Sequence, residues 1–330
     1  MTSNPTRPPL ASGALDRDAS TRMSEERLRD AWRDPAARLL RLRGVEIPVV
    51  SSGNGVRLAW RPASGDRAAT DVYLGRIDGA PAFARSEPAA VDGAPAVDGA
   101  PAADGAAPAG ERERAGAADE RWTHPFQVGA GLPEVEREAI GVASALLRWQ
   151  EAAGFSPRDG GPTEPIQGGW ARLDAHGGEH FPRTDPAVIV LIEHDDRVLL
   201  GSNALWESGR FSLLAGFVEA GESLEQAVER EVFEESGVRL EEIAYVTSQP
   251  WPFPRSLMLG FRARLAAGSD PDALVADPTE ISELRWFTRD ELREPHESLT
   301  LPMPLSIARW MIDRWVAEGN TAAGDVRATR

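Results

Sequence analysis

Seven glutamates and a single arginine fall in one stretch, GFVEAGESLEQAVEREVFEESGV, which spans residues 216–238. Three of these acids, Glu231, Glu234 and Glu235, are spaced so that a helix would place like charges next to one another, where they repel. Carboxylates that project together on one side of a helix suit Mg²⁺ or Mn²⁺, which in turn bind phosphate oxygens of a substrate. A solvated acidic face is the alternative interpretation of such a charge run.

The sequence around these acids predicts a helix over residues 223–236. Ser223 can cap its start, with Gln226 three residues later to complete a capping box. Gly237 suits the left-handed position that ends a helix. Apolar residues at i,i+4 spacing form a stripe that would be buried, namely Leu224, Val228 and Val232. The helix is therefore well specified, and its acidic face is held in a fixed orientation.

The spacing of the stretch resembles the Nudix box of the Nudix hydrolases at every specified position. The matching residues are Gly216, Glu222, Arg230, Glu231, Val232, Glu234, Glu235, Gly237 and Val238. We expect Arg230 to orient the glutamates through charge-assisted hydrogen bonds, with Glu222 as its partner. Glu231 is the expected principal metal ligand, and Glu235 or Glu234 the expected base.

A second motif, SQPWPFPRS at residues 248–256, lies ten residues beyond the box. Three prolines that alternate with aromatic residues predict a rigid extended loop after a strand rather than a central strand or a helix. The simpler interpretation is a structural loop pinned by Trp251 and Phe253. Placed after a Nudix box, however, the string is very similar to the array that marks the NADH pyrophosphatase branch of the superfamily.

This resemblance, which covers residues 139–318 and faintly the N-terminal domain, implies a set of site residues. The implied metal ligands are Glu231, Glu234, Glu235, Glu280 and the backbone carbonyl of Ala215. The implied dinucleotide loop consists of Gln249, Pro250, Trp251, Pro252, Phe253, Pro254, Arg255 and Ser256. Three further positions implied to contact substrate are Phe217, which would stack on a base, Phe181 and Ala308; for the last two, ordinary packing is an equal alternative. The resemblance also implies a homodimer.

The branch commonly carries a four-cysteine zinc ribbon, and this chain has no cysteine. At the matching positions stand Ser156, Asp159, Asp174 and Gly177. We therefore expect no zinc, and a ribbon topology that survives with packing from Trp170 and Phe181. His176 and His180 are expected to be surface residues.

Composition excludes several kinds of chemistry. The 36 basic residues are all arginine, which removes Schiff-base lysines and the P-loop lysine. The lack of cysteine removes disulfides, thiolate metal sites and cysteine nucleophiles. A net charge of -16 argues against non-specific binding to duplex nucleic acid. No apolar run approaches a membrane span, and the first residues carry prolines and charges where a secretory signal would be apolar, so we expect a cytoplasmic protein without a membrane partner.

The predicted fold class is α/β, a Nudix α/β/α sandwich with a mixed sheet, preceded by a smaller β-rich N-terminal domain and a degenerate zinc-ribbon-like module. Short β segments are predicted over residues 45–63 and 70–84, and a helix within 133–155. In the second half, a hairpin is predicted around the turn HDD, followed by strands near 239–248, 256–265 and 283–287 and a helix over 304–317. The predicted boundaries are a disordered tail (1–20), an N-terminal domain (21–138) with a disordered Ala/Gly/Asp/Pro insertion at about 85–120, a linker helix and ribbon-like module (139–185), a Nudix domain (186–318) and a tail (319–330).

The favoured function is metal-dependent hydrolysis of the pyrophosphate bond of NADH or NAD to nicotinamide mononucleotide and AMP. An RNA capped with NAD would present the same bond. One alternative is a Nudix hydrolase of another nucleoside diphosphate derivative such as ADP-ribose, against which the intact SQPWPFPRS argues. The other is a non-catalytic module that senses dinucleotides, against which the complete set of helix glutamates argues.

Overall fold

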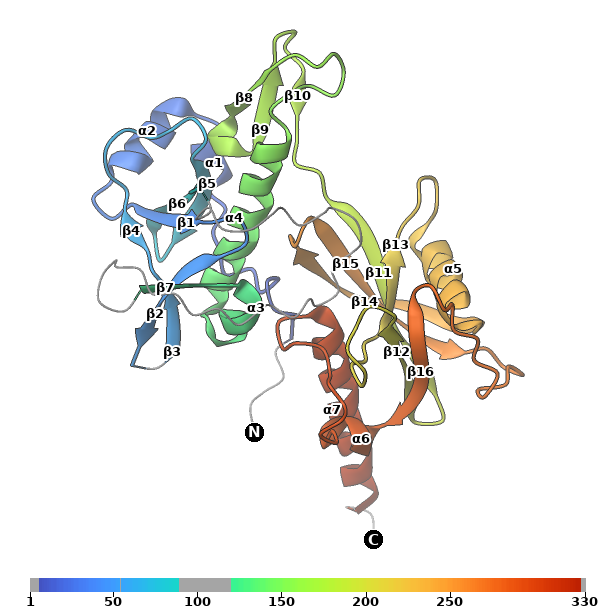
Figure 1. The fold of residues 1–330 in the computed structure, drawn as a ribbon. Helices are drawn as coiled ribbons and strands as arrows, with labels where there is room; N and C mark the ends of the chain where they lie inside the picture. Colours follow the sequence, from blue (N-terminus) through green and yellow to red (C-terminus); the bar gives the residue numbers. More distant parts are fainter. Residues whose placement is uncertain (1–5, 54, 89–119, 328–330) are drawn as a thin grey trace. The chain divides into compact units, whose positions relative to one another are not determined.

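A computed structural model of the chain describes residues 6–53, 55–88 and 120–327 (Figure 1). Its contacts divide the chain into two units. The N-terminal unit comprises residues 12–184 and 251–255, and the C-terminal unit comprises residues 1–11, 185–250 and 256–330. No helix among the residues described is both long and apolar enough to cross a membrane.

The C-terminal unit is built on a six-stranded mixed sheet with the order β14–β15–β11–β12–β16, in which β13 also pairs with β11. The strands are β11 (Asp185–His194), β12 (Arg197–Asn203), β13 (Leu214–Phe217), β14 (Leu240–Trp251), β15 (Ser256–Leu265) and β16 (Ile281–Thr288). β11 runs parallel to β15 and antiparallel to β12 and β13. The predicted strands are confirmed, and β14 extends to Trp251, beyond its expected end near residue 248.

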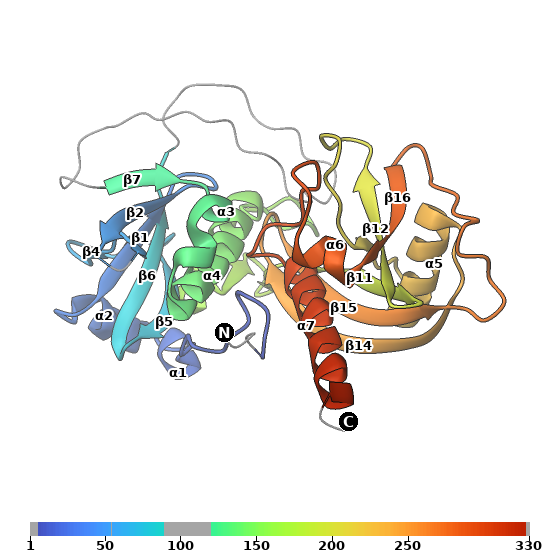
Figure 2. The same cartoon turned by 90° about the horizontal axis from the view of Figure 1, so that it is seen from below.

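Helices cover both faces of this sheet, because the side chains of β11 alternate between two cores. Val188, Val190 and Ile192 pack in a cluster with α5 (Leu224–Ser236). Ile189 and Leu191 point to the opposite face and pack in a cluster with α7 (Ile307–Arg327). The C-terminal unit therefore has three layers, α/β/α, with the sheet in the middle (Figure 2).

Local signals fix the turns and helix ends as expected. Asp195 and Asp196 join β11 to β12 with φ values of 45° and 57°, the left-handed conformations of a tight hairpin turn. Ser223 and Gln226 form the capping box at the start of α5, and Gly237 ends that helix with φ 71°. The short helix α6 (Arg289–Arg293) follows β16.

The helix predicted over 304–317 is α7, which begins at Ile307 and continues to Arg327. The predicted tail over 319–330 is therefore helical as far as residue 327. The apolar periodicity on which the prediction rested fades after Val316, although the Ala-containing sequence that follows is compatible with a helix.

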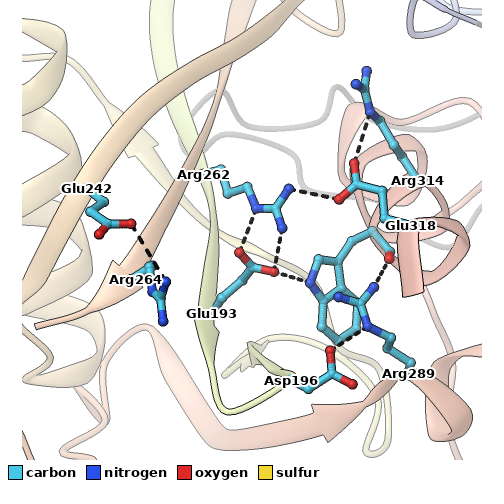
Figure 3. A network of polar contacts seen from close by, with 9 residues as sticks. Glu193, Asp196, Glu242, Arg262, Arg264, Arg289, Arg314 and Glu318 are labelled. Carbon is cyan, nitrogen blue, oxygen red and sulfur yellow. Dashed lines mark hydrogen bonds and ion pairs between the residues drawn. The ribbon is translucent and has the colours of Figure 1, made fainter. Parts of the chain in front are cut away.

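A network of ion pairs fastens α7 to the sheet (Figure 3). Arg262 of β15 donates to both carboxylate oxygens of Glu193 on β11, at 2.6 and 2.7 Å, and to Glu318 on α7 at 2.8 Å. Glu193 also accepts a hydrogen bond from the indole nitrogen of Trp315. Arg289 stacks on the Trp315 ring, with its guanidinium carbon 3.9 Å from the ring centre. These contacts hold the middle of α7 against one face of the sheet.

The described residues of the N-terminal unit form three small sheets, with strand orders β4–β1–β6–β5, β3–β2–β7 and β10–β9–β8. Its strands are β1 (Arg38–Leu42), β2 (Ile47–Ser52), β3 (Gly55–Leu58), β4 (Arg61–Pro62), β5 (Val72–Ile77), β6 (Ala80–Ser86), β7 (Glu120–Thr123), β8 (Thr163–Ile166), β9 (Ala171–Asp174) and β10 (Glu179–His180). Its helices are α1 (Ala19–Arg22), α2 (Glu25–Arg33), α3 (Pro125–Val128) and α4 (Glu134–Ala152), with 3₁₀ turns η1 (Gly129–Gly131) and η2 (Gln167–Gly169). The predicted β segments and the predicted helix over 133–155 are confirmed.

Helix α4, expected as a linker, packs on β5 and β6 within the N-terminal unit. The contacts therefore group residues 139–184 with the N-terminal sheets rather than setting them apart. The predicted insertion at about 85–120 coincides with the end of β6 and the start of β7, and residues 89–119 lie outside the described part.

The expectation of a disordered tail over residues 1–20 does not hold for residues 6–20. Glu138 on α4 accepts hydrogen bonds from the Ser12 hydroxyl and the Leu15 backbone, both at 2.8 Å. Leu15 is itself buried. A buried carboxylate needs hydrogen-bond donors, and this segment supplies them, although its aperiodic composition gave no sign of a partner so far along the chain.

Candidate active site

Arg230 is the centre of the polar contacts on α5. Its Nε and Nη2 donate to the two carboxylate oxygens of Glu222, at 2.8 and 2.9 Å. Its Nη1 lies 2.9 Å from Glu231 Oε1 and 3.0 Å from Glu234 Oε2. The structure therefore brings four of the predicted site residues together. One guanidinium offsets the repulsion among three of the acids, which explains how the structure tolerates glutamates at this spacing.

The same arginine ties the segment before α5 to the helix. Arg230 Nη2 donates to the backbone carbonyl of Phe217 at 2.9 Å. Glu222 also accepts a hydrogen bond from the Glu219 backbone at 3.0 Å. The hydrogen bonds from Arg230, followed by that from Glu219, lower the pKa of Glu222 to about 2. Glu222 is therefore a carboxylate at neutral pH, committed to Arg230 and to its own turn.

Glu235 lies at the buried side of the helix and is only 7% exposed. Its Oε2 atom is buried and has no hydrogen-bond partner among the residues described. Burial, together with the negative charges of Glu231 and Glu280, raises the pKa of Glu235 to about 8, and a hydrogen bond from the Ala215 backbone opposes this shift. The cluster is thus short of positive charge at this carboxyl group.

Glu231 approaches the backbone of β13 closely. A Cβ atom at Gly216 would overlap the Glu231 carboxylate, so a larger residue at this position of the motif would displace that side chain. Burial raises the pKa of Glu231 against the opposing effect of Arg230, and the charges of Glu234 and Glu280 add to the rise. The end of β13 and the acidic face of α5 are therefore in direct contact.

These residues fit a divalent cation. In the three ranges that the structure describes, no three His, Asp or Glu side chains stand as a group ready to hold a metal ion, and Glu231 and Glu234 each pair with Arg230 instead. A buried carboxyl oxygen without a partner is nevertheless unfavourable unless something binds it. Since Glu231 and Glu280 are close enough to raise the pKa of Glu235, a cation is the group that this donor set would accept.

No role was predicted for Asp277, whose charge also raises the pKa of Glu235. Its side chain accepts hydrogen bonds from the Thr279 backbone and hydroxyl, at 2.8 and 2.7 Å. Its backbone carbonyl accepts from Glu280 at 3.1 Å. Asp277 therefore shapes the turn that carries Glu280, and the string DPTE is a turn signal from which this could have been inferred.

The motif SQPWPFPRS departs from its predicted form. Its first half continues β14, and Pro250 is accommodated because β14 is an edge strand, where a missing backbone donor is tolerated. The expectation of a loop beginning directly after residue 248 is therefore wrong for residues 249–251. Only Pro254 and Arg255 are exposed, whereas the side chains of Gln249, Trp251, Pro252, Phe253 and Ser256 are buried.

Trp251 and Phe253 take part in an aromatic cluster within the N-terminal unit. Phe126 stacks on Trp251 with ring centres 5.2 Å apart and meets Phe253 edge-on at 5.1 Å. Trp251 is 7% exposed and Phe253 is 6% exposed. This geometry matches the simpler interpretation of the motif, a segment pinned by its two aromatic side chains.

The remaining predicted contacts differ in their accessibility. Phe217 is 37% exposed and lies at the end of β13. Phe181 is 60% exposed, so the expectation that it packs in the ribbon-like module is wrong. Ala308 is 3% exposed and belongs to the core cluster around α7. Of these three, Phe217 and Phe181 can offer a ring to a ligand.

The segment predicted to form a ribbon-like module contains the three-stranded antiparallel sheet of β8, β9 and β10 and two aspartate–histidine pairs. Asp159 lies 3.1 Å from His176, and Asp174 lies 3.1 Å from His180. His180 is partly buried, in contrast to its expected surface position. Trp170 packs as expected, and its indole nitrogen donates to the Tyr73 carbonyl at 2.7 Å.

Comparisons with known proteins agree with these motifs. The NUDIX domain family matches residues 183–305. A protein of Mycobacterium tuberculosis named NAD-capped RNA hydrolase NudC is 46% identical over 204 residues, which cover 58% of this chain and 64% of that protein. Its Salmonella newport counterpart of the same name is 43% identical over 189 residues, which cover 57% of this chain and 68% of that protein. The match thus spans somewhat less than two thirds of the mycobacterial relative.

Among solved structures, a NUDIX hydrolase from Nitrosomonas europaea aligns with a TM-score of 0.40 and 24% identity, over 50% of this chain and 90% of that one. The family assignment rests on the sequence relatives and on the motif residues that the fold brings together. The chain belongs to the Nudix superfamily and, within it, to the NADH pyrophosphatase family that includes the NudC proteins.

Proposed function

We propose that this protein hydrolyses the pyrophosphate bond of NADH or NAD, in the presence of a divalent cation, to nicotinamide mononucleotide and AMP. The observation that carries the proposal is the buried Oε2 atom of Glu235, which has no hydrogen-bond partner among the described residues and is exposed to the negative charges of Glu231 and Glu280. A bound cation would neutralise phosphate charge and lower the pKa of a bound water. Mg²⁺ and Mn²⁺ are both suitable for such oxygen ligands.

Each residue has a distinct role in this proposal. Glu231, Glu235 and Glu280 would hold the cation together with the Ala215 carbonyl, and Glu234 would join them once released from Arg230. Glu235 is the proposed base, which takes a proton from the attacking water. Of the two bases considered, it is preferred because its Oε2 atom pairs with no described residue of the protein, while Glu234 pairs with Arg230.

Arg230 and Glu222 are proposed to orient the other acids without meeting substrate. Phe217 is the proposed stacking surface for a base, because its ring is partly exposed beside the acidic face of α5. Phe181 is kept as a second aromatic contact. Arg255 and Pro254 are the members of SQPWPFPRS with exposed side chains and are the proposed contacts from that segment.

A second candidate substrate is RNA capped with NAD, which presents the same bond. The names of the mycobacterial and Salmonella relatives favour it. The net charge of -16 opposes non-specific attraction of an RNA chain, so a free dinucleotide remains the first substrate to test. A homodimer and a cytoplasmic location are predictions that accompany this proposal.

The test is product analysis after incubation with NADH and either Mg²⁺ or Mn²⁺, with ADP-ribose and an NAD-capped RNA in parallel. Release of nicotinamide mononucleotide and AMP supports the proposal, while cleavage of ADP-ribose alone supports the other hydrolase. Binding of NADH without any cleavage supports the sensing module.

Matched variants locate the site. Glu231→Gln and Glu235→Gln should each lower turnover by about a hundredfold or more, the scale of a lost ligand or base. Glu229→Gln removes an exposed carboxylate from the same helix and should retain near-normal turnover. Near-normal turnover in both site variants would refute the assignment.

A further inference from the structure

Gln249, implied by resemblance to contact substrate, is completely buried, with 0% of its surface exposed. Its amide nitrogen donates to the backbone carbonyls of Pro9, at 2.7 Å, and Leu305, at 2.9 Å. Its amide oxygen accepts a hydrogen bond from the backbone nitrogen of Ile307 at 2.7 Å. All four residues lie in the C-terminal unit. Both polar atoms of the side chain are therefore used inside the protein.

The three partners of Gln249 are backbone groups, and one of them is a nitrogen at the start of a helix. Ile307 is the first residue of α7, and the first nitrogens of a helix have no acceptor within the helix. Ser306 satisfies another of them, because its hydroxyl accepts from the Arg309 backbone at 3.2 Å. Only a primary amide offers two donors and an acceptor in one neutral group of this size. The chemistry of the site thus explains why a glutamine stands at this position.

We propose that Gln249 is a positioning residue, which acts through the start of α7 and never meets the substrate. Its hydrogen bonds hold the backbone of residues 305–307 in position and keep Pro9 beside it. The segment around Pro9 is thereby a component of the C-terminal unit, in which Leu10 is also buried.

The start of α7 is connected to the acidic face of α5 by close packing. Ile307 and Ala308 belong to the core cluster against which Ala215 packs. A Cβ atom at Gly260 would come within 3.1 Å of the Ile307 side chain, so β15 leaves the first turn of α7 little room to move. Ala215 in turn donates its backbone nitrogen to Glu235. A displaced first turn of α7 would therefore shift one wall of the proposed cation site.

The test compares Gln249→Met with Arg262→Met. Methionine is similar in length to glutamine but forms no such hydrogen bonds. The control removes the ion pairs that fasten the middle of α7 (Figure 3) and leaves its first turn intact. Gln249→Asn, which keeps the amide but is one methylene shorter, provides a milder second variant if the methionine variant does not fold.

Two readouts are independent of hydrolysis. Hydrogen exchange of the Ile307 amide, measured without metal, should accelerate about tenfold or more in the Gln249 variants and stay near the wild-type rate in Arg262→Met. Binding of Mn²⁺ alone, followed by electron paramagnetic resonance, should weaken about tenfold in the Gln249 variants only. Unchanged exchange at Ile307, unchanged Mn²⁺ binding, or equal effects in the control would each overturn the proposal.

The effect on catalysis rests on the proposed function. The Mn²⁺ concentration for half-maximal hydrolysis of NADH should rise about tenfold in Gln249→Met, while turnover at saturating Mn²⁺ falls by less than about threefold. A loss of turnover that saturating Mn²⁺ does not restore would indicate direct contact with substrate and overturn the positioning role. If the wild type hydrolyses none of the substrates, the proposed function fails, and the exchange and binding measurements still decide the role of Gln249.

Discussion

Replacing Glu235 with glutamine should stabilise the metal-free protein, and the gain should grow with pH. Burial raises the pKa of Glu235 from 4.5 to about 8 in the folded chain. Because its pKa is higher in the folded state, Glu235 binds its proton more tightly there than in the unfolded chain. The resulting contribution to the unfolding free energy is fully present below pH 4.5 and is lost as the pH rises through 8. The glutamine variant has no such loss, since its side chain does not titrate.

The size of the effect follows from the interval between the two pKa values. Each pKa unit corresponds to about 1.4 kcal/mol. Between about pH 5.5 and about pH 8.5, the wild type should lose about 3 kcal/mol of unfolding free energy that Glu235→Gln retains. Because Glu235 is only 7% exposed, solvent screening reduces this figure little.

The assay is urea unfolding of both proteins in EDTA at the two pH values, followed by tryptophan fluorescence. The quantity compared is the difference in unfolding free energy between variant and wild type, in which other titrations common to the two proteins cancel. Glu229→Gln tests whether removing any negative charge from the helix has the same effect. A difference that changes by less than about 1 kcal/mol between the two pH values, or an equal change in the control, would refute the reasoning.

Three further outcomes can be measured. EDTA should abolish hydrolysis reversibly without unfolding the chain, and metal analysis of the purified protein should find no stoichiometric zinc; one tightly held zinc ion per chain would contradict this. Trp251→Ala should lower the unfolding free energy by about 3–5 kcal/mol, because Trp251 is buried against Phe126, and should reduce kcat/KM for NADH and ADP-ribose in the same proportion; a selective loss for NADH would argue for direct contact. Glu222→Gln should lower turnover about tenfold by releasing Arg230 from its bidentate partner, and turnover within about twofold of the wild type would exclude that role.

The helix with the acidic face could be predicted in detail because its signals are local. Ser223 and Gln226 lie within one turn of the helix start, and Gly237 lies directly after its last residue. The hairpin at Asp195 and Asp196 is similarly set by adjacent residues. Each of these features depends on backbone conformations that a few neighbouring side chains favour, so the sequence is sufficient to infer them.

The burial and contacts of SQPWPFPRS could not be predicted in the same way. Alternating prolines and aromatic residues indicate a stiff segment, but stiffness does not determine which side chains face the interior. Gln249 binds Pro9, which is 240 positions away in the sequence. Trp251 stacks on Phe126, and both belong to the N-terminal unit, whereas the other residues of β14 belong to the C-terminal unit. Such partners become visible only when the tertiary structure brings distant segments together, which is also why the segment over residues 6–20 was expected to be a tail.

Arg230 neutralises some of the acids around α5 but not all of them, so the acidic face is asymmetric in charge. The guanidinium binds Glu222, Glu231 and Glu234 but does not reach Glu235, whose Oε2 atom lacks any partner in the part of the chain that the structure describes. Were the acids only a solvated surface, the least favourable carboxyl group would be expected in water rather than in the interior. A buried, unpartnered carboxyl group is maintained instead, which is typical of a group whose partner arrives with a ligand. This asymmetry supports the proposed cation site over the alternative of an exposed acidic face.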